Sequence, residues 1–235
     1  TAERALADLD ALLETLPPHR RGLPLVLSVG RLHPVKGMAT LARAWTSNED
    51  LSSRANLVIV GGDLRRPTSD EAAQLDLLDE IVPCDTGPDC GLLLAGHRTN
   101  PTVAAWLSAV RRGRPGLSAP NGVYACASLK EEFGIALCEA LGSGIVVVAP
   151  HEGGPPTYIE DGVTGVLVDT ADTAALGEAV AAALDLAAAP DTQERAAHAR
   201  QVVLDRFSIT TMAEALAPVY ANVAHEQVPR ERVAG

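Results

Sequence analysis

The chain has 235 residues, of which 47% are hydrophobic and 21% are charged, so it can bury a core and is not of a disordered composition. Its formal net charge of −11 argues against a nucleic-acid-binding protein, because such proteins gather Lys and Arg to neutralise phosphates. There is no apolar run of 18 residues and no signal-peptide pattern, so we expect a cytoplasmic protein without a transmembrane segment.

Short apolar runs alternate with helical patterns along the chain, which is typical of a parallel β-sheet with crossover helices. The strand-like runs are continuously aliphatic, which indicates burial on both faces of the sheet. We therefore predict an α/β fold with a doubly wound, Rossmann-like parallel sheet. The predicted strands span residues 23–30, 56–62, 91–96, 122–128, 144–150 and 164–169, and the predicted helices span residues 37–45, 69–82, 100–112, 133–141, 172–188, 191–206 and 208–225.

Three segments are expected along the chain. Residues 1–20 should form a leader helix or linker, residues 21–207 the Rossmann-like domain, and residues 208–235 a terminal helix and a tail frayed over its last ten residues. Segments 63–68 and 83–90 are rich in Pro, Asp and Gly and are predicted to be surface loops.

The four cysteines fall into two groups. Cys126 and Cys138 lie in apolar runs and should be buried thiols. Cys84 and Cys90 allow a disulfide, half a metal site or a coincidence within a loop, and no second Cys or His pair is spaced to complete a metal site.

In a doubly wound sheet, ligands bind outside the carboxyl ends of the strands. The predicted strands place five segments there: residues 30–37, 61–66, 96–100, 128–139 and 150–157. We expect the functional residues to concentrate in these segments.

The first of these segments contains two cations. In "SVGRLHPVKGM", the strand ends at Gly30, and Arg31 and Lys36 then flank a short loop before a helix. Cations beside a helix N-terminus form a natural anion site, and Arg offers a planar fork for phosphate oxygens. The alternative is two solvated surface charges.

Two glutamates in "SLKEEFGIALCEALGSG" are separated by eight positions. On one regular helix, Glu131 and Glu139 would lie about 12 Å apart along the axis and about 80° apart around it, which suits a shared acid/base pair poorly. We predict instead that Glu131 lies in a loop and Glu139 in the helix, with the free amides of residues 133–138 between them facing an anion. The alternative for Glu139 is an exposed stripe of the helix.

A glycine pair follows the fifth predicted strand, in "APHEGGPPTYIEDGVTGVLVD". Gly153 and Gly154 would let the backbone approach a ligand closely and point amides at it. The alternative is a purely structural turn.

These three motifs resemble, in their order and spacing, the C-terminal half of retaining glycosyltransferases with the GT-B architecture. The family is group 1, or family 4, which contains sucrose-phosphate synthase, sucrose synthase and bacterial mannosyl- and glucosyltransferases. Its hallmark is two glutamates separated by seven residues. The resemblance covers about residues 22 to 185, and "VAAWLSAVRRGRPGLSAPNGVYACASLKEEFG" is most similar to the sucrose-phosphate synthase group.

The resemblance assigns roles at a nucleotide-sugar donor site. Arg31 and Lys36, after Gly30, would hold the diphosphate and stabilise the departing nucleoside diphosphate. Glu131 would contact hydroxyls of the donor sugar, and Glu139 would accept hydrogen bonds from the ribose. The remaining implied contacts are backbone amides of Phe133, Gly134 and Ile135 at the sugar, those of Leu137 and Cys138 at the phosphates, His97 and Arg98 beside the base, and Gly153 and Gly154 shaping the pocket.

The resemblance also implies a reaction and a partner. A hexose would pass from a nucleoside diphosphate sugar to an acceptor hydroxyl with retained configuration and without a metal or other cofactor. An N-terminal GT-B domain that is missing from this chain would supply the acceptor site, the final helix would cross back to it, and this chain would be inactive alone. Glu132 and Thr157 depart from the family pattern, which has a small residue and often an acid at these positions.

Two other functions stay open: a nucleotide-binding or regulatory module without catalysis, and a GT-B-like sugar-nucleotide epimerase. A phosphorylase lacks a lysine context for pyridoxal phosphate, and a dinucleotide dehydrogenase lacks G-x-G-x-x-G after the first strand. The sequence does not give the nucleotide base, the sugar, the acceptor or the oligomeric state.

Overall fold

The computed structural model describes residues 1–83 and 85–226. Within this part of the chain lies a sheet of six strands in the order β3-β2-β1-β4-β5-β6, with parallel pairing throughout. The chain winds outward from β1 to β3 and then returns to β4 on the other side, so the order reverses between β1 and β4. The strands are β1 Leu25–Val29, β2 Asn56–Val60, β3 Leu92–Gly96, β4 Val123–Ala125, β5 Val146–Pro150 and β6 Gly165–Val168.

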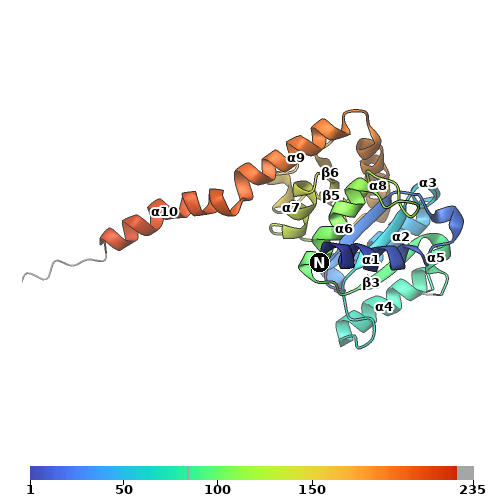
Figure 1. Cartoon of the computed structure of the whole chain (residues 1–235). Coiled ribbons are helices and arrows are strands. Elements are labelled where there is room, and N and C mark those ends of the chain that lie inside the picture. The colour runs from blue at the N-terminus through green and yellow to red at the C-terminus, as the bar shows by residue number, and fades with distance from the viewer. Residues whose placement is uncertain (84, 227–235) are drawn as a thin grey trace, which may run out of the picture.

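Helices cover both faces of the sheet (Figure 1). Buried residues of α1, α6 and α7 share a core cluster on one face, and those of α2, α4 and α8 share a cluster on the other. This arrangement confirms the predicted doubly wound fold. The helices are α1 Ala2–Leu13, α2 Met38–Ser47, α3 Glu49–Arg54, α4 Ser69–Ile81, α5 Gly87–Cys90, α6 Asn100–Arg112, α7 Ile135–Gly142, α8 Thr173–Ala188, α9 Thr192–Phe207 and α10 Ile209–Glu226.

The continuous aliphatic strands are explained by burial on both faces. Successive side chains of a strand point to opposite faces. In β1, Leu25 and Leu27 join the cluster beneath α1 and α6, whereas Val26 joins the cluster beneath α2 and α8. A polar residue at any of these positions would lose its contact with water, so the strands lack polar alternation.

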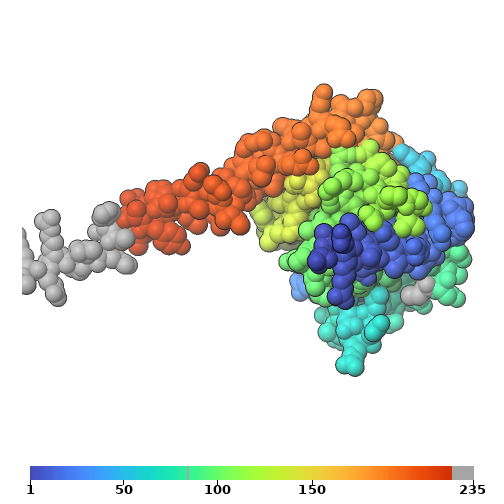
Figure 2. Space-filling view, viewed as in Figure 1, coloured from blue at the N-terminus to red at the C-terminus, as the bar shows by residue number. Residues whose placement is uncertain are grey.

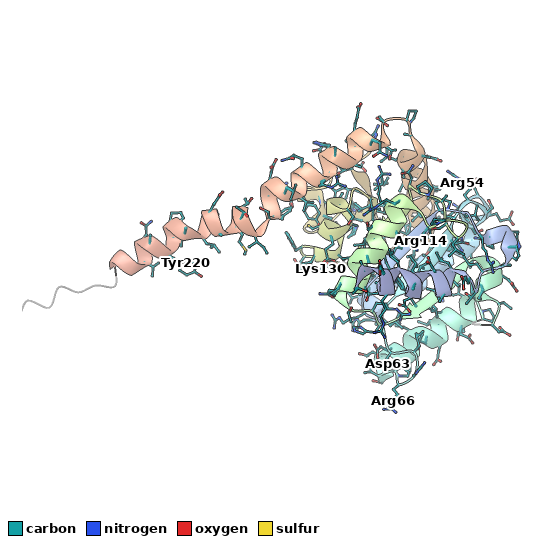
Figure 3. All side chains as sticks on the ribbon, viewed as in Figure 1. Arg54, Asp63, Arg66, Arg114, Lys130 and Tyr220 are labelled. Atoms are coloured by element: carbon teal, nitrogen blue, oxygen red, sulfur yellow. The ribbon has the colours of Figure 1, made fainter. Side chains whose placement is uncertain are left out.

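The predicted leader helix exists as α1, and it packs against α6. Leu9 and Leu13 are fully buried, and the indole of Trp106 donates a hydrogen bond of 2.8 Å to the carbonyl of Ala5. Arg114, which is labelled in Figure 3, forms two hydrogen bonds to the carboxylate of Asp10, at 2.7 and 2.6 Å. The helix thus completes one layer of the core, and the division of the chain at residue 20 stays a prediction.

Two short helices were not among the predicted elements. α3 begins after Asn48, whose side chain accepts a hydrogen bond of 2.9 Å from the amide of Leu51, so an N-cap signal was present in the sequence. α5 lies in the segment 83–90, which was predicted to be only a loop.

The cysteine predictions are tested in part. Cys126 and Cys138 are buried, as predicted, and Cys90 is an exposed free thiol. A free Cys90 does not support the disulfide alternative, and Cys84 itself lies outside the described residues.

The last described helix, α10, projects away from the body of the domain (Figures 1 and 2). Its exposed large apolar side chains are Ile209, Met212, Leu216, Val219, Tyr220 and Val223. In the described part of the chain no single helix has both the length and the apolar character needed to cross a membrane; α8 and the helical segment after it meet that test only as a pair bent by 108°. The predicted fraying of the tail falls on residues 227–235, which lie outside the described residues.

The packing of α1 can be tested with Leu9→Ala. This substitution should lower the free energy of unfolding by about 2–5 kcal/mol, because it removes a fully buried side chain and leaves a cavity. Denaturant unfolding of the chain measures the change. The control is Leu204→Ala on α9, where the side chain is exposed and the expected change is within about 0.5 kcal/mol. Equal effects of the two substitutions would show that α1 is not part of the folded core.

Candidate functional site

A cavity of about 850 Å³ opens at the carboxyl ends of the strands. This volume is in the range of small-molecule binding sites. It lies where the strand order reverses, between the loops after β1 and β4. Four of the five segments predicted to carry function line it: the segments after β1, β2, β3 and β4.

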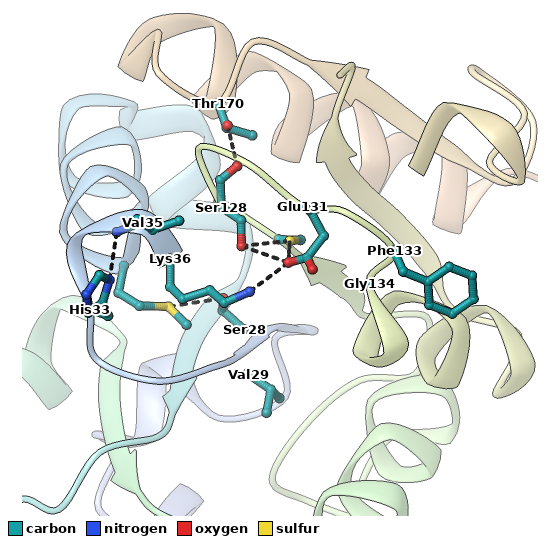
Figure 4. Close-up of polar contacts among 12 residues, drawn as sticks. Ser28, Val29, His33, Val35, Lys36, Ser128, Glu131, Phe133, Gly134 and Thr170 are labelled. Atoms are coloured by element: carbon teal, nitrogen blue, oxygen red, sulfur yellow. Dashed lines mark hydrogen bonds and ion pairs between the residues drawn. The ribbon is translucent and has the colours of Figure 1, made fainter. Parts of the chain in front are cut away.

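An ion pair joins the loop after β1 to the loop after β4. Lys36 Nζ lies 2.7 Å from Glu131 Oε2, and the two side chains are 26% and 17% exposed. The hydroxyl of Ser128 donates a second hydrogen bond, of 3.1 Å, to the same carboxylate oxygen (Figure 4). The amide of Leu129 donates to the carbonyl of Val35 at 2.8 Å. The two loops are therefore joined by both side chains and backbone.

The N-terminus of α7 faces the same cavity. The helix begins at Ile135 after Gly134, and its first residues line the cavity. Among the described residues, the amides of Ile135, Ala136 and Leu137 have no hydrogen-bond acceptor. Such amides carry partial positive charge and bind anions.

Cys138 requires a correction to the predicted run of free amides. Its amide donates to the carbonyl of Gly134 at 3.1 Å, because residue 138 is the first that can close an i→i−4 helical bond to that carbonyl. Its thiol is buried in the core cluster beneath α7, and burial raises the pKa of the Cys138 thiol. The free amides therefore end at Leu137.

Arg31 and Glu139 line the cavity with exposed side chains. Neither makes an ion pair or a side-chain hydrogen bond with another described residue. Although its sequence neighbours are apolar, Glu139 is not buried in the core but is a carboxylate on the cavity wall. As predicted, Glu131 lies in a loop, Glu139 lies within the helix, and the helix N-terminus lies between them.

His97 and Arg98 also line the cavity, but they differ in their freedom. His97 is exposed. The guanidinium of Arg98 lies 2.6 Å from the Asp8 carboxylate and is stacked over the ring of Trp106 at 5.3 Å from its centroid. Arg98 therefore links α1 to the loop after β3, and its contact with a nucleobase stays a prediction.

Gly153 and Gly154 do not line the cavity. They lie behind the loop that carries Glu131, and the amide of Gly154 donates to the Glu131 carbonyl at 3.0 Å. A Cβ on Gly153 would lie 2.3 Å from the Glu131 carbonyl oxygen, and one on Gly154 would lie 2.1 Å from that of Glu132. The pair shapes the cavity indirectly, by allowing close approach of the two backbones.

The ring of Phe133 turns away from the Lys36–Glu131 pair (Figure 4). It packs against Tyr158 and Phe207, with ring centroids 5.8 and 5.1 Å away. The Tyr158 hydroxyl donates to the Phe133 carbonyl, and burial raises the pKa of Tyr158, so the phenol keeps its proton. This aromatic cluster anchors the loop between Glu131 and α7.

Sequence reasoning missed several side chains of the cavity. Ser128, whose hydroxyl donates to Glu131, is the last residue of a predicted strand. Its position at the carboxyl end of that strand was the signal by which the sequence could have identified it as a site residue. Tyr124 and Cys126 precede it at alternate positions of the same strand region, and burial raises the pKa of both groups. Asp63 and Asn100 also line the cavity from within segments predicted to carry function, although neither was named as a site residue, and Glu71 lies outside those segments. Among the described residues, no group of three or more His, Cys, Asp and Glu side chains could hold a metal ion.

The model of the family described as "Glycosyl transferases group 1" matches residues 23–186. The chain belongs to this family. A sucrose synthase from Acidithiobacillus caldus is 34% identical over 170 residues, which are 71% of this chain and 21% of that protein. The group 1 assignment made from three motifs is therefore confirmed.

Solved structures show the same fold. The sucrose-phosphate synthase of Thermosynechococcus elongatus matches with a TM-score of 0.71 and 27% identity, over 94% of this chain and 49% of that one. Anabaena Alr3699/HepE in complex with UDP-glucose matches with a TM-score of 0.68 and 22% identity, over 92% of this chain and 53% of that one. The chain thus spans about half of each of these two structures, and the predicted Rossmann-like half of a GT-B fold is confirmed.

The role of Gly153 in the glycosyltransferase domain can be separated from simple backbone strain. Gly153 and Gly162 both have positive φ, +88° and +71°, but a Cβ on Gly162 would meet no atom within 4 Å. Gly162→Ala should cost only the left-handed strain of about 1–2 kcal/mol. Gly153→Ala should cost more and displace the loop of Glu131. Denaturant unfolding measures both losses, and equal losses would contradict the proposed support of this loop.

Proposed function

We propose that this chain is the donor-binding domain of a retaining glycosyltransferase. It would bind a nucleoside diphosphate sugar and contribute to transfer of a hexose to an acceptor hydroxyl. The observation that carries the proposal is the Lys36–Glu131 pair beside the free amides of α7, where the strand order reverses. UDP-glucose in the Anabaena relative supports a uridine nucleotide as the first ligand to test.

The charges of the cavity suit a diphosphate. Arg31 and Lys36 provide two cations, and the α7 N-terminus adds about half a positive charge. Glu131 already neutralises part of the charge of Lys36, so a bound diphosphate would compete with the carboxylate for the ammonium. Electrostatic stabilisation of the leaving phosphate by preorganised donors is then the main contribution of this domain to catalysis.

The carboxylates take the hydroxyls on either side of the diphosphate. Glu131, held by Ser128 and Lys36, would accept from the donor sugar. Glu139, exposed further along α7, would accept from the ribose. The amides of Gly134 and Ile135 would lie between these two positions, as the motif predicted.

The proposal includes a partner and a location. An N-terminal GT-B domain would supply the acceptor site and cover the exposed apolar side chains of α10, such as Ile209 and Tyr220. Retention of configuration, catalysis without a metal and inactivity of this chain alone belong to the same proposal. The cytoplasm is the compartment in which we expect the enzyme to work.

The binding role of Lys36 can be tested with UDP and pyrophosphate. Lys36→Ala should weaken both about 10-fold to 150-fold, because it removes a charge-assisted hydrogen bond worth about 1.5–3 kcal/mol. Calorimetric titration of the chain measures both affinities. Lys130→Ala is the matched control, because Lys130 is exposed and does not itself line the cavity, although its partner Glu132 does. Unchanged UDP affinity in Lys36→Ala would contradict the proposed site.

Glu139 should act on the nucleoside rather than on the phosphates. Glu139→Ala is expected to weaken UDP binding about 10-fold or more, since a carboxylate acceptor is lost, and to leave pyrophosphate binding unchanged. Glu178→Ala on α8, an exposed glutamate outside the cavity, controls for the change in net charge. An equal loss for UDP and pyrophosphate would place Glu139 outside any ribose contact.

Catalysis is tested in the full-length enzyme with its N-terminal domain. Lys36→Ala should cost about 2–4 kcal/mol of transition-state stabilisation, as does the loss of an oxyanion donor. Transfer from UDP-glucose is measured as kcat/KM. Near-wild-type turnover in Lys36→Ala would contradict the catalytic role of this residue. UDP binding without any transfer in the wild-type enzyme would instead favour a regulatory module without catalysis.

A further inference from the structure

A second cavity, of about 750 Å³, lies near the amino ends of β4 and β5, whereas the proposed donor site lies at the carboxyl ends of the strands. It is formed by the C-terminal ends of α6 and α7, the residues before β4 and one face of α9. None of its lining residues lines the cavity at the carboxyl ends of the strands. It is therefore a separate site, to which no role has been assigned so far.

Three arginines line this cavity: Arg111, Arg112 and Arg200. Within the described residues, none of them pairs with a carboxylate. Four arginines elsewhere in the described part of this acidic protein do have such a partner. Arg54, Arg98, Arg114 and Arg195 each form an ion pair with an aspartate.

Neutral groups hold the three guanidinium groups in place. Arg111 donates to the side chains of Asn121 and Gln193, the latter at 3.0 Å. Arg112 donates to the hydroxyl of Ser108. Arg200 donates to the carbonyl of Gly142 at 3.1 Å. These bonds orient the guanidinium groups without cancelling their charge, and they leave other N–H donors for a ligand.

The arginines also oppose one another. The pKa of Arg111 is lowered, first by burial and then by the charge of Arg200. Clustered like charges raise the free energy of the folded state unless an anion lies between them. Arg111 is half-buried and Arg112 and Arg200 are exposed, so an anion from solvent can reach all three guanidinium groups and would relieve this repulsion.

The C-termini of α6 and α7 do not balance this charge. Each helix end carries about half a negative charge, so the two together offset about one of the three guanidinium charges. About two positive charges remain, which matches a phosphate monoester of about −1.5 to −2 at neutral pH better than a single carboxylate. Guanidinium forks also fit phosphate oxygens in bidentate geometry.

We propose that this arginine cavity, lined by Arg111, Arg112 and Arg200, binds the phosphate group of a small phosphorylated metabolite. The volume exceeds that of phosphate alone and leaves room for the rest of such a molecule. The site is independent of the nucleotide-sugar site, so its test does not depend on donor binding.

The test is a titration of the isotopically labelled chain with inorganic phosphate at constant ionic strength, followed by amide chemical shifts. Phosphate should shift amides at Asn121, Gly142 and Ser143 in a saturable way. The double substitution Arg111→Gln/Arg200→Gln should weaken this response at least tenfold. The control is Arg43→Gln, which removes one positive charge from an exposed arginine on α2 outside the cavity. This substitution should leave the phosphate response unchanged.

Two results would overturn the proposal. One is a response confined to residues 31–36 and 134–137, which would mean that phosphate binds only at the donor site. The other is an equal loss in Arg43→Gln, which would mean a general effect of net charge. Arg200 donates to the carbonyl of Gly142 at the C-terminal end of α7, so the double variant could fail to fold. In that case Arg112→Gln is tested in its place. Its guanidinium bonds only the side chain of Ser108, and a saturable response left unweakened in that variant would also contradict the site.

Discussion

The ion pair between Lys36 and Glu131 joins two loops that are 95 residues apart in the chain. It is the contact that turns two neighbouring strand ends into one site, because β1 and β4 are adjacent only through the reversal of strand order. An ion pair that is partly exposed contributes little to stability. Its value here is positional, since it sets a cation and a carboxylate beside the N-terminus of α7.

The rest of the structure holds the two loops at this distance. Behind Glu131, the glycine pair at 153–154 lets a third loop approach the backbone, as the contact of Gly154 with the Glu131 carbonyl shows. Thr170 donates to the carbonyl of Ser128 at 2.7 Å, and the aromatic cluster fixes Phe133. The flexible-looking loop after β4 is thus tied to β5, β6 and α9, which makes it a preorganised part of the site.

Helices α6 and α7 each line one cavity with their first residues and the other cavity with their last residues. α6 and α7 begin at the proposed donor site, with Asn100 and Ile135, and end at the arginine cavity, with Arg112 and Gly142. Their N-termini attract anions through the helix dipole, whereas their C-termini repel them. Anion binding at the second cavity therefore has to come from arginine side chains, and these are what the cavity contains.

The six strands, the longer helices and their order could be predicted from the sequence, because buried parallel strands and amphipathic helices have distinct patterns that need no partner to be recognised. The two glutamates, the cations after β1 and the helix N-terminus were predicted from short motifs beside the expected strand ends, and their roles from the resemblance to the family. The state of each side chain was not. Arg98 pairs with Asp8 on α1, Cys138 uses its amide within α7, and the glycine pair acts from behind the cavity. The arginine cavity was also missed, since it gathers residues from α6, α7 and α9 that no local spacing connects. The sequence by itself therefore determined the fold, the family and the edge of the sheet that carries the proposed donor site. Only the tertiary structure decided which groups remain free to bind, because that depends on partners that lie far away in the chain.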